Sequence, residues 1–152
     1  MAQLETADDV KSSTSPDLNR FVKYGLLTIV IAVIVNSAIR VVAYQFITIH
    51  SAFWPLEWEA VAGSTALTII GATFIYWAVT RLSQRPNRIF VIIAALVLLL
   101  SFGSFIVPPP ILEETPPSVS AVLAGMHVSV AVISVSLLTR ISNTTSESDN
   151  RH

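Results

Sequence analysis

Residues 24–44 read YGLLTIVIAVIVNSAIRVVAY, and this stretch decides the fold class. Its main polar interruptions are Asn36, Ser37 and Arg40. At 1.5 Å per residue, a helix of this length would measure about 31 Å, which matches the hydrocarbon core of a bilayer. The stretch therefore predicts a transmembrane helix.

Three further apolar stretches follow, at residues 60–82, 89–107 and 119–138. The chain of 152 residues is 53% hydrophobic and 12% charged, which is about half the charge of a typical soluble domain. Residues 83–88 form so short a connection that the helices on either side must be antiparallel. We therefore predict an all-α fold, an integral membrane bundle of four antiparallel helices within residues 21–140.

Both ends of the chain are polar. Residues 1–20 and 141–152 lack a hydrophobic period, so we expect two disordered cytoplasmic tails. Four spans place these tails and the 83–88 connection on one side of the membrane. That side carries eight of the nine Lys and Arg residues, namely Lys11, Arg20, Lys23, Arg81, Arg85, Arg88, Arg140 and Arg151. Because Lys and Arg concentrate in cytoplasmic loops, the pattern predicts an N-in/C-in topology.

A layer of polar side chains lies in the outer half of the predicted bundle. Its members are Asn36, Arg40, Thr68, Ser101 and His127. Counted from the outer end of each span, four of them lie about 9–12 Å below the outer surface, and Arg40 lies one helical turn above.

Two interpretations of this layer stay open. In the first, the polar groups satisfy one another, since interhelical hydrogen bonds in membranes contribute about 0.6 kcal/mol each. Arg40 would then extend to the outer headgroups. In the second, Asn36, Arg40 and His127 line a small outward-facing pocket, because ionisable groups inside a membrane are costly and often functional.

Several chemistries lack the residues that they need. The spans contain no Asp or Glu, which argues against a carboxylate pathway for protons or cations. The chain has no cysteine and one histidine within the spans, so we expect no metal site and no cofactor. It has no Ser-His-Asp set within the spans and no glycine-rich phosphate loop, so we predict that it is not an enzyme. Nothing in the sequence supports nucleic-acid binding.

Small residues recur every four positions at the start of the second span: Ala60, Ser64, Thr68 and Ala72. Such spacing allows helices to approach closely in lipid. Besides the bilayer, we therefore expect a partner on this face, either a second copy in a homodimer or another membrane protein.

Two functions remain open. The first is an interaction or accessory subunit without enzymatic activity. The second is a small-solute binder or transporter that uses the outer polar layer. A pocket lined by Asn36 and His127 would favour the second, and close packing at these residues would favour the first.

Short motifs give the chain a resemblance to a known group. They are Asn36, the segment Arg85-Pro86-Asn87-Arg88-Ile89-Phe90, Ser101 and Met126-His127. Over about residues 20–140 the chain resembles a family of small four-span prokaryotic membrane proteins with a domain of unknown function. The resemblance implies a multi-pass protein of a bacterial or archaeal plasma membrane, and it implies no activity.

Overall fold

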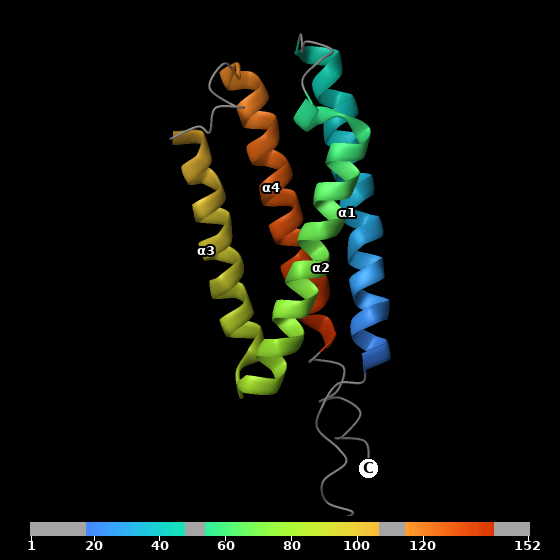
Figure 1. The fold of residues 1–152 in the computed structure, drawn as a ribbon, viewed down its shortest axis with the longest axis vertical. Coiled ribbons are helices and arrows are strands. Elements are labelled where there is room, and N and C mark those ends of the chain that lie inside the picture. Colours follow the sequence, from blue (N-terminus) through green and yellow to red (C-terminus); the bar gives the residue numbers. More distant parts are fainter. Residues whose placement is uncertain (1–17, 48–53, 107–114, 142–152) are drawn as a thin grey trace, which may run out of the picture.

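The computed structural model describes residues 18–47, 54–106 and 115–141. They form α1 (Leu18–Phe46), the short 3-10 helix η2 (Trp54–Leu56), α2 (Trp58–Leu82), α3 (Pro86–Ile106) and α4 (Pro117–Leu138) (Figure 1). The described residues contain no strand, which confirms the all-α prediction. Each of the four α-helices is long and apolar enough to cross a membrane, as predicted.

Prolines and a short turn set the ends of the helices. α2 ends at Leu82, after which Ser83 has an extended backbone. α3 begins at Pro86 and α4 at Pro117, where the missing N–H costs no helical hydrogen bond. The starts of α1 and α3 and the ends of α2 and α4 lie together at the lower end of the bundle in Figure 1. The bundle is therefore antiparallel, and the opposite end is called the upper end below.

Two predicted boundaries shift by a few residues. α1 begins at Leu18, so residues 18–20 belong to the helix and not to the expected tail. Ile141 is fully buried in the lower core, so the bundle also extends one residue beyond the predicted limit at residue 140. The rest of both expected tails lies outside the described residues.

The lower end has a core to which all four helices contribute. Its buried members are Phe21, Tyr76, Phe90, Leu138 and Ile141. The Tyr76 hydroxyl also donates a hydrogen bond of 2.6 Å to Oδ1 of Asn87, which links α2 to the first turn of α3. The lower end of α3 is therefore firmly attached.

The upper core is built differently. Its buried members are Leu56, Val61, Val119 and Met126, and among the described residues α3 contributes none. Within an apolar stretch of 18 residues in each helix, only 6% of the residues are buried in α3, compared with 28% in α4. Figure 1 accordingly shows α3 leaning away from α2 above their connecting turn.

α1 packs through a face of small and polar residues. Its buried positions are Phe21, Gly25, Thr28, Ala32, Asn36 and Ala43. A Cβ atom added to Gly25 would lie 3.2 Å from the side chain of Thr73, so glycine allows α1 and α2 to approach closely there.

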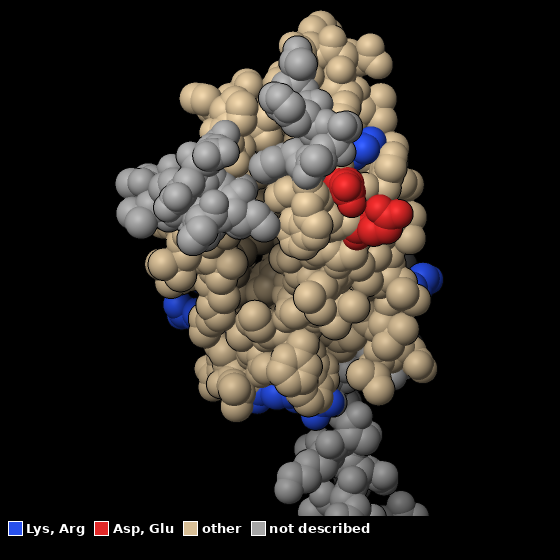
Figure 2. Space-filling model, turned by 45° about the horizontal axis from the view of Figure 1, so that its top comes forward, with Lys and Arg blue, Asp and Glu red and all other residues tan. Residues whose placement is uncertain are grey.

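Charged residues separate between the two ends of the bundle. Arg20, Lys23, Arg81, Arg85 and Arg88 lie in or next to the lower ends of α1, α2 and α3, whereas Glu57 and Glu59 lie at the upper start of α2. In Figure 2 the red atoms lie above a group of blue atoms at the bottom of the view. This separation agrees with the charge pattern that predicts the N-in/C-in topology. The topology itself stays a prediction.

Candidate ligand-binding cavity

A cavity of about 300 Å³ lies between α2, α3 and α4, with one wall residue from α1. It is lined by Asn36, Pro55, Val61, Ser64, Thr65, Thr68, Gly71, Ala72, Ile75, Phe90, Ile93, Ala94, Val97, Leu98, Ser101, Leu123, Met126, His127, Val130, Ala131 and Ser134. Figure 2 shows a hollow in this part of the surface, between the regions of α3 and α2. The cavity exists because α3 packs on its neighbours mainly at the lower end.

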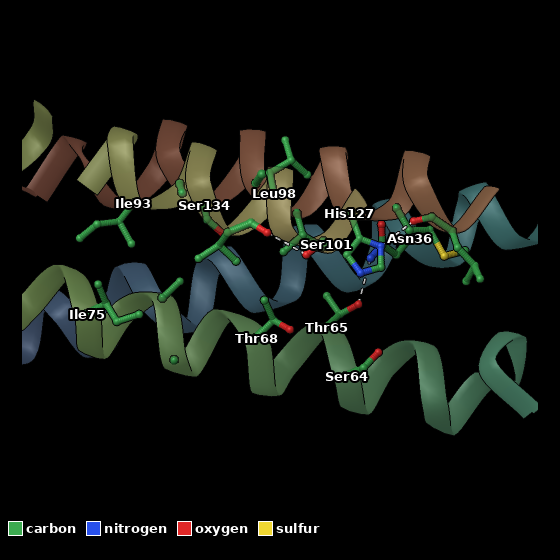
Figure 3. A pocket seen from close by; sticks show the side chains of 18 of the residues that line it. Asn36, Ser64, Thr65, Thr68, Ile75, Ile93, Leu98, Ser101, His127 and Ser134 are labelled. Carbon is green, nitrogen blue, oxygen red and sulfur yellow. Dashed lines mark hydrogen bonds between the residues drawn. The ribbon is translucent and has the colours of Figure 1, made fainter. Parts of the chain in front are cut away.

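Polar groups are not spread evenly along the cavity. In Figure 3, where the upper end of the bundle lies to the right, Asn36, Ser101 and His127 lie further to the right than Ile75 and Ile93. The described lining residues include no Lys, Arg, Asp or Glu. The described lining therefore offers no carboxylate, ammonium or guanidinium group, and it becomes more apolar toward the lower end.

Asn36 joins three helices at the upper part of the cavity. Its side chain is 3% exposed. Its Nδ2 donates a hydrogen bond of 2.9 Å to the hydroxyl of Thr65 on α2. Its Oδ1 accepts a hydrogen bond of 2.5 Å from the hydroxyl of Ser129 on α4. Asn36 thus has the interhelical bonding role of the first interpretation, while it also lines the cavity.

His127 lies on the cavity wall of α4 and is exposed in the isolated chain. Its Nδ1 lies 2.7 Å from the carbonyl oxygen of Leu123, one turn earlier in the same helix. Because a carbonyl can only accept, Nδ1 carries the proton in this geometry, and Nε2 of the neutral ring is an acceptor. His127 therefore places an imidazole beside the polar end of the cavity.

Thr68 and Ser101 also line the cavity, from α2 and α3 respectively. The Ser101 hydroxyl donates a hydrogen bond of 2.9 Å to the carbonyl of Val97 in its own helix, and Thr68 is exposed. Four of the five predicted residues, Asn36, Thr68, Ser101 and His127, thus line one cavity.

Arg40 is the predicted residue that does not line the cavity. Its Nε donates a hydrogen bond of 2.5 Å to the carbonyl of Leu56. Its guanidinium carbon lies 4.6 Å from the ring centre of Tyr44 and 4.2 Å from that of Trp58. Arg40 therefore does not line this cavity together with Asn36 and His127, and it ties α1 to η2 and to the start of α2.

Ser134 is a cavity residue that the predicted layer omits. It is 4% exposed, and its hydroxyl has no hydrogen-bond partner in the described structure. A buried hydroxyl without a partner is costly, so such groups call for an explanation. Ser134 lies seven positions after His127, on the same face of α4. This spacing is the signal that could have found it.

Part of the small-residue stripe of the second span borders the cavity. Ser64 and Thr68 are exposed and line the cavity, whereas the buried positions of α2 are Val61, Thr65, Ile69 and Tyr76. No described contact bears on the predicted homodimer or on another protein partner.

Comparisons with known proteins identify a family. The model of DUF6069, a family of unknown function, matches residues 16–144, which are most of the chain. A search of the curated proteins and a search of the solved structures found no match. The predicted resemblance to a four-span family of unknown function is confirmed, and the predicted prokaryotic origin stays an expectation.

Proposed function

Because the chain belongs to DUF6069, a family without an assigned activity, we propose a function from the cavity itself. The protein is a membrane-embedded binding protein, without enzymatic activity, that holds a small and largely apolar molecule between α2, α3 and α4. The cavity of about 300 Å³ is the observation that carries this proposal.

The size and the lining of the cavity argue that it is filled in the membrane. It is open on one side, and most of its wall is apolar. Water is a poor filler for the lower part, where Ile75, Phe90 and Ile93 offer no hydrogen bonds. A mostly apolar guest fits the lining better.

Two glycines of α2 provide a matched test. Gly71 lines the cavity and Gly63 does not, and an added Cβ would meet nothing within 4 Å at either position. Gly71→Phe should fill much of the cavity, whereas Gly63→Phe adds the same side chain elsewhere on the same helix. The purified chain in lipid nanodiscs would be labelled with adamantane diazirine, a small apolar photolabel, and its labelled residues would be mapped.

The expected result is labelling of cavity residues such as Met126 and Ala131 in the wild type and in Gly63→Phe. Gly71→Phe should lose this labelling by about tenfold or more, while the melting temperatures of the two variants stay similar. Labelling confined to lipid-facing residues, or equal labelling of the cavity in both variants, would refute the proposal.

The other predicted function, an interaction or accessory subunit, stays a prediction without a described contact in its favour. Location in a prokaryotic plasma membrane with both termini inside is likewise our proposal. It is supported by the four apolar helices and by the concentration of Lys and Arg at the lower end.

A further inference from the structure

We infer that the guest is an uncharged membrane lipid whose compact head has hydrogen-bond acceptors at two opposite ends, as in a prenylated quinone. Its head occupies the cavity and its chain leaves sideways into the bilayer between α2 and α3. This inference rests on the proposed binding function and adds the chemical class and the route of entry.

The volume first limits the occupant. About ten water molecules would fill 300 Å³ at their liquid density, so the cavity suits a ring-sized group.

The charge of the lining next limits the head. The described wall carries no Lys or Arg to pair with a phosphate or carboxylate, and no Asp or Glu to pair with an amine. An unpaired charge in an apolar site is strongly disfavoured. The head is therefore uncharged, and hydroxyl groups of the wall recognise it.

Ser134 supplies the second polar contact. Its hydroxyl is buried on the cavity wall and has no partner in the described structure. Ser134 lies seven residues below His127 on α4, which is about 10 Å along the helix axis. A head with acceptors at both ends would accept a hydrogen bond from the Thr68 hydroxyl, in the upper part of the cavity, with one oxygen. Its other oxygen would accept a hydrogen bond from Ser134.

The packing of α3 indicates the route of entry. Phe90 fixes the lower end of α3 in a core with the other three helices. The upper core takes no residue from α3 within the described part of the chain. Above Phe90, α3 is therefore less firmly packed, and we place the opening on its α2 side, where Figure 1 shows α3 leaning away from α2. This side faces the bilayer, so a lipid chain attached to the head can stay in lipid.

The test compares three lipids as competitors of adamantane diazirine labelling in nanodiscs. Decylubiquinone has a quinone ring with two opposed carbonyls, hexadecanol has one uncharged oxygen, and palmitate has a charged head. Each is titrated against the wild type, Ser134→Ala and, as a control on the same helix, Ser136→Ala, whose serine is exposed and does not line the cavity.

Decylubiquinone should displace the label at a concentration at least tenfold lower than the other two lipids. Ser134→Ala should raise that concentration about three- to tenfold, as expected for one lost hydrogen bond. The same change should leave hexadecanol unaffected, and Ser136→Ala should change neither.

Other results separate the two proposals. If the cavity is labelled but decylubiquinone competes no better than palmitate or hexadecanol, the lipid class is wrong and the binding function stands. If Ser134→Ala weakens all three lipids equally, the assignment of the second contact is wrong. If adamantane diazirine never labels the cavity, both proposals are wrong.

Discussion

Replacing Asn36 tests the part of the bundle that the structure defines most sharply. Asn36→Leu keeps a side chain of similar size but removes one hydrogen bond to Thr65 and one to Ser129. Interhelical hydrogen bonds in membranes contribute about 0.6 kcal/mol each, so the direct loss is about 1.2 kcal/mol.

The partners left behind add little to this loss. The Ser129 hydroxyl also lies 2.8 Å from the carbonyl of Met126 in its own helix, so it keeps an acceptor. The Thr65 hydroxyl is buried but can turn to a carbonyl of its own helix, as threonines in helices commonly do. We therefore expect Asn36→Leu to lower the free energy of unfolding by about 1–2 kcal/mol. A buried polar group that is left without any partner costs up to about 3 kcal/mol, and neither Thr65 nor Ser129 should be left in that state.

A double-mutant cycle gives the sharper result. Unfolding in detergent mixtures would be followed by tryptophan fluorescence for Asn36→Leu, Ser129→Ala and the double variant. The coupling energy should be about 0.5–1 kcal/mol. A parallel cycle of Asn36→Leu with His127→Leu should show a smaller coupling, because the Nδ1 bond of His127 stays within α4. Coupling to His127 that equals or exceeds coupling to Ser129 would refute this account of the polar layer.

Three further predictions concern helix packing, the upper end and the topology. Gly25→Ala should lower the melting temperature in detergent, because its Cβ would lie 3.2 Å from the side chain of Thr73. The Cβ of Gly125→Ala meets nothing within 4 Å, so this change should be neutral or stabilising by up to about 1 kcal/mol, and the reverse order of the two variants would contradict the packing. Arg40→Gln should destabilise the chain by about 1–3 kcal/mol through the loss of two ring contacts and a charged hydrogen bond, and an unchanged unfolding curve would contradict this role. A cysteine at Glu59 should react with an impermeant reagent on intact cells and one at Gln84 should not; labelling at Gln84 from outside would reverse the topology.

The helices could be predicted from the sequence because length and apolar composition alone identify a membrane span. Their connections followed from prolines and from the short segment around Pro86. Asn36 could be found as well, since a carboxamide in the middle of an apolar stretch is rare and must be bonded.

The rotation of each helix could not be predicted. In lipid both the packed face and the outer face of a helix are apolar, so hydrophobic periodicity carries little information. The second span shows the consequence. The spacing of small residues draws attention to Ser64 and Thr68, but Thr65, next to Ser64, makes the buried contact with Asn36 within the bundle.

The members of the cavity were only partly predictable for a related reason. Span 4 contains several serines, and composition does not separate Ser129, which bonds Asn36, from Ser134, which lines the cavity without a partner. Arg40 was assigned to the layer by depth, but its long side chain reaches the Leu56 carbonyl and the ring of Trp58. Depth along a helix therefore predicts the level of a group but not its partner.

An experimental structure of the chain in lipid nanodiscs tests the central claim most directly, because the claim concerns what occupies the space between α2, α3 and α4. The account predicts density for a bound molecule in this cavity, within hydrogen-bonding distance of Ser134, with a chain that passes between α2 and α3. An α3 packed against α2 and α4 along its whole length, with the cavity closed and Ser134 bonded within its own helix, would contradict it.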